Sequence, residues 1–183
     1  VHSSTQMTIY NLDGVKEIEK LGYSRCVLAR ELSIEEIKNI CKNTNIEIEV
    51  FIHGALCICY SGQCLMSSLI GGRSGNRGKC AGTCRLPYSL LKDGQEQEKG
   101  YLLSSKDVCT LDILPELIEA GVKSFKIEGR MKNVTYAAYV TSIYRKYVDK
   151  YIANGRKGYR VSDKDIEQLC DIYNRGAFTT GFY

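Results

Sequence analysis

The stretch from residue 49 to residue 88 constrains the fold most, because it cannot form one continuous helix or strand. It reads EVFIHGALCICYSGQCLMSSLIGGRSGNRGKCAGTCRLPY and carries five of the nine cysteines, which are Cys57, Cys59, Cys64, Cys80 and Cys84. Six glycines interrupt it from Gly62 to Gly82, and no Asp or Glu occurs between Phe51 and Lys92. Ordering a loop of this length costs much conformational entropy. We therefore expect its thiols to cross-link it.

The remaining composition is that of a globular protein with one core. The chain has 183 residues, of which 44% are hydrophobic and 25% charged, and no apolar run approaches the roughly 18 residues of a membrane span. The net charge of +4 matters because cations gather in the acid-free loop, which suggests an anionic partner. An odd number of cysteines without a secretory segment indicates a reducing compartment, the cytoplasm. The chain begins at Val1, and we interpret it as a piece of a longer protein.

Strand and helix patterns alternate along the chain. We expect strands over residues 1–10, 23–29, 46–52, 101–104 and 123–127, and a polar linker over residues 93–100. We expect helices over residues 12–20 and 111–120, a long helix from Asn133 to about Ala153, and a last helix from Ser162 onward. A further helix should begin after Ser33, which can form a capping box with Glu36.

This alternation predicts an α/β fold with a parallel sheet covered by helices. Polar or charged residues follow each strand, as they do around the site of a TIM-type (β/α) barrel. Only about five strands are present where a closed barrel needs eight. We therefore predict the C-terminal portion of such a barrel, with its N-terminal strands missing from this chain. Residues 1–155 would form the partial barrel, and residues 156–183 a helical tail leading toward a downstream domain.

The loop cysteines favour metal or cluster binding over simple burial. Their spacing lacks the doubled C-x2-C pattern of a zinc ribbon, so a structural zinc is possible but weakly indicated. Four thiolates from loops on one face suit an iron–sulfur cluster. Burial as a small hydrophobic side chain remains the interpretation for Cys26, Cys41 and Cys170, which sit inside strand or helix patterns.

Several other side chains are candidates for a site, each with a plain alternative. His53, at a strand end, could be a base, a ligand or a core histidine, and no catalytic dyad is evident. Arginines between glycines suit phosphate contacts and base stacking, or a solvated basic loop; these are Arg73, Arg77 and Arg85. Glu128 and Arg130 flank a glycine just past a buried strand, where they would shape a pocket or form an internal ion pair.

The segment EVFIHGALCICYSGQCLMS resembles the signature of the collagenase-like peptidase family U32. Matching positions lie at Glu49, Phe51, Gly54, Ala55, Cys57, Gly62, Cys64 and Ser67. The segments GNRGKCAGTCRLPY, LSSKDVC, FKIEGRMK and NRGAFTTGF resemble further blocks of the family, in order, so the resemblance covers nearly the whole chain. Within the family, the sequences of these segments are most similar to those of the RNA-modifying branches.

The resemblance implies an enzyme of a particular kind. Hydroxylases of the family act without oxygen on a tRNA uridine or a ribosomal RNA cytidine, carry a [4Fe–4S] cluster, and depend on prephenate as a hydroxyl donor. By position the cluster ligands would be Cys57, Cys64, Cys80 and Cys109, with Cys84 as a rival. Implied catalytic residues are His53, Glu128 and Arg130, and implied substrate-binding residues are Arg73, Arg77, Arg85 and Lys106. The alternatives are a peptidase, as the family name states, and a structural zinc module.

Overall fold

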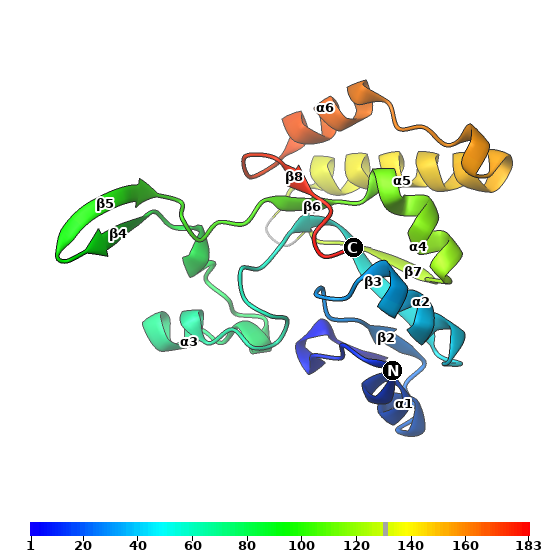
Figure 1. Ribbon diagram of the computed structural model, residues 1–183, viewed down its shortest axis with the longest axis horizontal. Coiled ribbons are helices and arrows are strands. Elements are labelled where there is room, and N and C mark those ends of the chain that lie inside the picture. Colours follow the sequence, from blue (N-terminus) through cyan, green and yellow to red (C-terminus); the bar gives the residue numbers. More distant parts are fainter. Residues whose placement is uncertain (130–131) are drawn as a thin grey trace.

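The computed structural model describes residues 1–129 and 132–183 and shows a mixed α/β protein (Figure 1). Its main sheet has the strand order β1-β2-β3-β6-β8, with β7 paired to β3. The bounds are β1 His2–Ser3, β2 Arg25–Val27, β3 Glu47–Ala55, β6 Asp107–Cys109, β7 Ser124–Ile127 and β8 Phe178–Thr179. A separate two-stranded sheet pairs β4 Tyr88–Lys92 with β5 Gln95–Gly100.

Six α-helices are described, and three of them begin with side-chain caps at positions that the sequence indicates. Their bounds are α1 Leu12–Lys20, α2 Ile34–Lys42, α3 Met66–Gly71, α4 Leu114–Ala120, α5 Val134–Asn154 and α6 Asp163–Ile172. The side chain of Asn11 caps α1, Ser33 and Glu36 form the capping box of α2, and Asn133 caps α5. Each cap satisfies a backbone N–H that has no partner within its helix.

The parallel arrangement is confirmed for β1, β2, β3 and β7, whereas β6 runs antiparallel to β3. Parallel neighbours need a crossover connection, usually a helix. The chain instead leaves β3 through the cysteine-rich loop and the β4–β5 hairpin, so it returns to β3 from the opposite direction. The described strands do not close into a barrel, and the missing N-terminal strands stay a prediction.

Several segments differ from the prediction. Of residues 1–10, expected as a strand, only His2–Ser3 form β1, and Thr5–Met7 form a short 3-10 helix. Residues 93–100, expected as a linker, contain the turn of the β4–β5 hairpin and all of β5, while residues 101–104, expected as a strand, form a turn. Asp93 and Gly94 both have positive φ, 53° and 77°, which suits the tight turn of a hairpin. Figure 1 shows this hairpin projecting from the body of the molecule.

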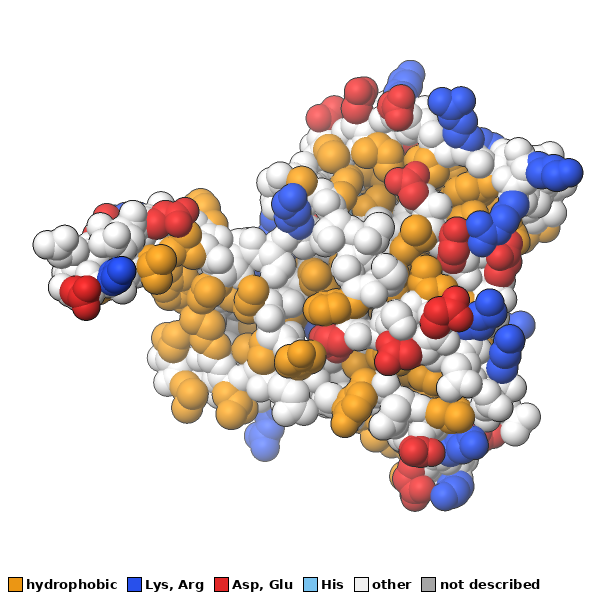
Figure 2. All heavy atoms as spheres, in the orientation of Figure 1, with side chains coloured by type: hydrophobic (Ala, Val, Ile, Leu, Met, Phe, Trp, Pro, Cys, Tyr) orange, Lys and Arg blue, Asp and Glu red, His pale blue; other side chains and the backbone are white. Residues whose placement is uncertain are grey.

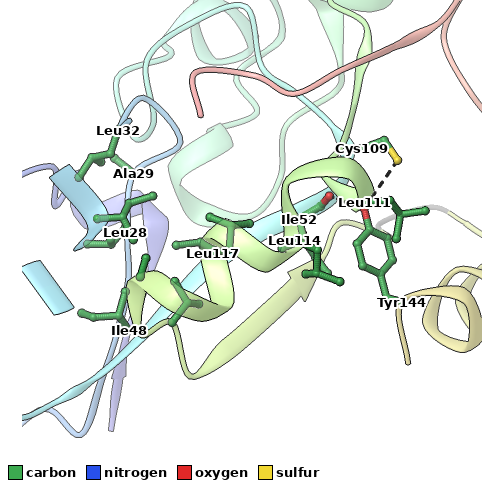
Figure 3. Close-up of a cluster of buried hydrophobic side chains, with 14 of the residues drawn as sticks. Leu28, Ala29, Leu32, Ile48, Ile52, Cys109, Leu111, Leu114, Leu117 and Tyr144 are labelled. Carbon is green, nitrogen blue, oxygen red and sulfur yellow. Dashed lines mark hydrogen bonds between the residues drawn. The ribbon is translucent and has the colours of Figure 1, made fainter. Parts of the chain in front are cut away.

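The core lies between the sheet and the helices that cover it. Leu111, Leu114 and Leu117 are fully buried, and Figure 3 shows them beside Leu28, which directly follows β2, Ile48 and Ile52 of β3 and Tyr144 of α5. Within the described part of the chain, no helix is long and apolar enough to cross a membrane.

Residues 156–183 pack against the body of the protein. The carboxylate of Asp165 in α6 accepts hydrogen bonds from Lys146 (2.7 Å) and Tyr147 (2.5 Å) of α5, and Figure 1 shows the two helices side by side. Strand β8 joins β6, and the Tyr183 hydroxyl donates to the Phe51 carbonyl (2.7 Å). The predicted domain boundary near residue 155 stays a prediction.

Candidate functional site

The parallel strands all end at one edge of the sheet, called here the carboxyl edge. The cysteine-rich loop, residues 56–87, leaves β3 at this edge, and Glu128 follows β7 there. Open parallel sheets bind their ligands at this edge. The loop is folded by short helical turns and by Asn76, whose amide donates to the Gly62 carbonyl (2.7 Å).

Gly54 sets the geometry where β3 meets the loop. Its φ of +103° lies in the left-handed region, and a β-carbon there would overlap the Glu128 carbonyl oxygen. The Glu128 N–H donates to the His53 carbonyl (2.8 Å), and the Tyr136 hydroxyl donates to the Glu128 carbonyl (3.1 Å). Only glycine lets the two strand ends approach so closely.

Within the loop, three cysteine thiols act on a fourth, that of Cys84. Burial raises the pKa of the Cys84 thiol, and the thiols of Cys57, Cys80 and Cys64 raise it further, against the effect of Arg85. The Gly82 N–H donates to the Cys80 sulfur at 3.3 Å. These four thiols therefore belong to one neighbourhood, to which Cys84 contributes directly.

Cys59 joins the edge of this neighbourhood. Burial raises the pKa of its thiol, and a hydrogen bond with the Cys64 thiol and the nearby Cys57 add to the effect. These effects link all five cysteines of the loop. The sequence predicted that the loop cysteines act together but not how they are arranged in space.

Cys109 lies in a different environment. It is 8% exposed in β6, and the Tyr144 hydroxyl of α5 lies 3.8 Å from its sulfur (Figure 3). Burial raises the pKa of this thiol, and among the charges that act on it are Asp112 and Cys170. Of the four cysteines implied as ligands, the structure gathers three in the loop and sets Cys109 in the core.

Among the described residues, no three His, Cys, Asp or Glu side chains converge as ligands of a single metal ion. A tetrahedral zinc with Zn–S bonds of about 2.3 Å would bring its sulfurs to within about 3.8 Å of one another. The cysteine sulfurs that hold a four-iron cluster lie farther apart, because each of them binds a different iron atom. The loop thiols fit such a cluster in ligand type and number. All nine cysteines, each within the described residues, are free thiols.

His53 is a buried residue of the core. It is 1% exposed, its Nδ1 lies 3.3 Å from the Tyr144 hydroxyl, and its ring packs edge-on against Phe178 at 5.4 Å between centroids. Burial lowers its pKa to about 4. It is paired with Cys109 across β3 and β6, but both side chains are too buried for a peptide to reach. Its predicted catalytic role stays untested.

The buried His53 gives an expected pH dependence. Its pKa of about 4 in the folded protein lies below the ordinary value of about 6.5 in the unfolded chain. Protons therefore bind the unfolded chain first as pH falls from about 6.5 to 4, and stability is lost across that range. Urea unfolding should give a free energy about 2 kcal/mol lower at pH 5 than at pH 7.5. His53→Gln should remove most of this difference, and an unchanged pH dependence in that variant would contradict the assignment.

The predicted substrate-binding cations divide into two kinds. Arg77 and Lys106 are exposed, as is Arg73, whose Nε donates to the Lys79 carbonyl (3.0 Å). The Arg85 guanidinium instead joins two segments, donating to the Leu56 carbonyl at the start of the loop and to the Ser104 hydroxyl (3.0 Å) and the Ser105 carbonyl (2.6 Å) before β6. Arg85 thus holds the cysteine loop against the segment before β6.

Of the predicted pair beside Gly129, Glu128 is half-buried at the carboxyl edge. Arg130 lies outside the described residues.

A charged cluster beside Glu128 was not predicted. Asp107 at the start of β6 is 2% exposed, and Arg175 donates to its Oδ1 at 3.3 Å. The Lys132 ammonium lies over the Tyr173 ring, and hydrogen bonds from Lys132 and Arg175 outweigh burial and lower the pKa of Tyr173. The segments LSSKDVC, FKIEGRMK and NRGAFTTGF each supply a member, a convergence that only tertiary structure reveals.

The surface over the cysteine loop is apolar. Figure 2 shows hydrophobic side chains gathered between the hairpin and the body of the molecule. Those in and beside the loop with more than half of their surface exposed are Ile58, Tyr60, Leu65, Leu69, Ile70, Leu86, Leu90, Leu91 and Tyr101. Exposed patches of this kind mark interaction surfaces.

Fold and site together define an α/β protein with a thiol-rich loop at the carboxyl edge of its parallel strands. Peptidase family U32 matches the chain over residues 1–183. The chain belongs to this family, and its closer similarity to the RNA-hydroxylating branches is confirmed by its relatives.

Three relatives illustrate the range of the family. A tRNA hydroxylation protein P1 of Bacillus subtilis is 40% identical over 100% of this chain and 45% of its own length. A 23S rRNA 5-hydroxycytidine synthase of Escherichia coli is 47% identical over 83% of this chain and 24% of its own. A collagenase of Porphyromonas gingivalis is 35% identical over 100% and 47%.

The chain spans about half or less of the length of these relatives. No solved structure matches it.

Proposed function

We propose that this chain forms the cysteine-rich part of an iron–sulfur enzyme that hydroxylates an RNA base without oxygen. The base would be a ribosomal RNA cytidine or a tRNA uridine. The observation that carries the proposal is the position of Cys57, Cys64, Cys80 and Cys84 in one loop at the carboxyl edge of the sheet, where the first three thiols act on that of Cys84.

The proposed cofactor is a [4Fe–4S] cluster, which four cysteine thiolates usually hold. Three ligands are those that the family resemblance implies, Cys57, Cys64 and Cys80. We assign the fourth place to Cys84 rather than Cys109, because Cys84 lies among the other three while Cys109 is buried against Tyr144. When bound, the cluster would supply the redox chemistry of the hydroxylation.

The chain's own residues would bind and orient the substrates. Arg73, Arg77 and Lys79 are exposed on a loop without acidic residues, which suits RNA phosphates. We propose prephenate as the hydroxyl donor on the family resemblance, and its carboxylates would suit the same cations. Nine free thiols and an RNA substrate support a cytoplasmic location.

The names of the relatives support this choice among the functions of the family. Two of those described above are named for hydroxylation of tRNA or for synthesis of a hydroxylated rRNA nucleoside. The name of a third, collagenase, supports peptidase activity as a second candidate. A cysteine peptidase needs a thiol nucleophile beside a base that a peptide can reach. The pair His53 and Cys109 is buried, and the exposed cations suit an RNA better than a peptide bond.

Iron and acid-labile sulfide, counted after anaerobic purification and reconstitution, test the proposal. We expect a brown protein with about four irons and about four sulfides per chain. Cys84→Ala should lose most of this iron, whereas Cys109→Ala and the control Cys170→Ala should retain it. Mass spectrometry of RNA from cells that lack and regain the gene then identifies the hydroxylated base.

Each other outcome points to a different conclusion. Iron lost from Cys109→Ala but retained in Cys84→Ala would restore Cys109 as the fourth ligand. Colourless protein without iron would overturn the proposal. Zinc without sulfide would then favour a structural zinc module, and peptide cleavage by iron-free protein would favour the peptidase.

A further inference from the structure

A cavity of about 400 Å³ opens at the carboxyl edge, beside the start of the cysteine loop. Its lining comes from three segments, those that follow β1, β2 and β3, and comprises Thr8, Tyr10, Glu31, Leu32, Glu36, Tyr60 and Gln63. This volume lies within the range of roughly 300–1,000 Å³ that small-molecule sites occupy. It is large enough for one nucleobase.

The cavity is held in shape by contacts between the segments after β1 and β3. Thr8 has an unusual positive φ of 56°, and its hydroxyl donates to the Ser61 carbonyl (2.9 Å) while accepting from Gln63 Nε2 (3.3 Å). A β-carbon at Gly62 would overlap the Thr8 hydroxyl oxygen. Strained backbone of this kind persists where surrounding structure enforces it, often beside a ligand.

Two tyrosines give the cavity flat apolar walls that face water. Tyr10 is 60% exposed and Tyr60 is 69% exposed. Proteins that take up unstacked RNA bases do so by stacking them on aromatic side chains. Each stacked base contributes about 1–3 kcal/mol to binding.

The charge of the lining selects the kind of ligand. It contains two glutamates and no Lys or Arg, so it disfavours a phosphate and favours a group that donates hydrogen bonds. Glu36 is engaged by its capping box with Ser33. Ser61 donates to Glu31 Oε1 through its N–H (2.9 Å) and hydroxyl (3.2 Å). Every hydrogen bond from the described residues to this carboxylate goes to Oε1, which leaves Oε2 to accept from a ligand.

The cavity adjoins the thiol neighbourhood. Tyr60 and Gln63 lie in the short segment between Cys59 and Cys64. The thiols of these two cysteines interact with each other. A base in the cavity would therefore lie beside the loop that carries the proposed cluster ligands.

We propose that this cavity binds the RNA base that is modified, and that it prefers cytosine to uracil. The base would stack on Tyr60, and the cytosine amino group would donate to Glu31 Oε2. Glutamate accepts readily from this amino group, whereas uracil presents a carbonyl oxygen in its place. The proposal rests on the proposed function, because it names the substrate of the same site.

Fluorescence anisotropy with labelled hexacytidylate and hexauridylate, at one fixed salt concentration, tests the cavity. We expect the unaltered protein to bind hexacytidylate about 10-fold more tightly. Tyr60→Ala should weaken hexacytidylate binding by about 5- to 100-fold, and Tyr60→Phe should restore most of it. Glu31→Gln keeps the oxygen that Ser61 contacts and should bring the two affinities to within about 2-fold of each other.

Matched controls lie outside the cavity. Ile152 near the end of α5 is similarly exposed, 70%, and Glu35 is an exposed glutamate of α2, so Ile152→Ala and Glu35→Gln should leave both affinities unchanged. Equal weakening by Tyr60→Ala and Ile152→Ala, or a cytosine preference that survives Glu31→Gln, would overturn the proposal. Iron content measured on the same samples separates the two proposals, since a cytosine preference without iron would contradict the enzyme assignment and not the cavity.

Discussion

Replacing Gly54 with alanine is expected to destabilise the protein by more than about 4 kcal/mol, the range in which single substitutions unfold a domain. Two costs combine at this position. A φ of +103° is strained for any residue with a β-carbon, and that carbon would overlap the Glu128 carbonyl oxygen. The oxygen belongs to backbone fixed by the Tyr136 hydroxyl and by β7, so it cannot move aside cheaply. Thermal or urea unfolding followed by circular dichroism measures the loss.

Gly100→Ala is the matched control for this substitution. Gly100 ends β5, has no positive φ, and has open space where its β-carbon would lie. Its replacement should change the free energy of unfolding by less than about 0.5 kcal/mol. Similar stability of the two variants would show that the strand ends at Gly54 and Glu128 separate readily.

Arg175→Ala is expected to lower stability by about 3 kcal/mol, because it removes the hydrogen-bonded cation from a buried carboxylate. Asp107 is 2% exposed, and burial already raises its pKa against the effects of Arg175, Lys132 and Arg85. Without Arg175 the pKa should rise further. The unfolded chain then loses its proton at lower pH than the folded protein, so the cost is largest at neutral pH and shrinks as pH falls.

A double variant separates the ion pair from the packing of Arg175. Asp107→Asn removes the charge that Arg175→Ala would leave uncompensated, so the double variant should be more stable than Arg175→Ala alone at pH 7.5. Urea unfolding at pH 7.5 and pH 5 measures both effects. Strictly additive losses, with no pH dependence, would contradict the pairing.

Features with local causes were predictable from the sequence. The caps at Asn11, Ser33 and Asn133 and the alternation of residues 46–52 marked helices and a strand that the structure contains. Each depends on residues within one or two turns of chain, where side-chain period and capping chemistry act directly.

The hairpin was missed for a physical reason. The pair Asp93-Gly94 is a strong turn signal, but β5 reads QEQEKG and is almost wholly exposed. No apolar alternation marks a strand that buries nothing. Strand β8 likewise has no recognisable sequence pattern, because its two residues become a strand only by pairing with β6.

The candidate site was predictable in composition and not in arrangement. Cysteines and glycines located the loop, but the relation of Cys84 and Cys109 to the other thiols depends on where β6 lies beside β3. Asp107 and Arg175 are 68 positions apart, and the Tyr10–Tyr60 cavity joins three segments. Contacts of this range leave no periodic trace in a single sequence.

The late pairing of β8 and Tyr183 has a consequence for synthesis on the ribosome. Residues emerge in order, so β6 cannot complete its outer edge, nor the Phe51 carbonyl its bond to Tyr183, until translation nears residue 183. The loop cysteines emerge much earlier, while the outer edge of β6 is still unpaired. If the protein binds the proposed cluster, iron and sulfide delivered during translation would reach these thiols before β8 docks, and refolding from denaturant need not reproduce that order.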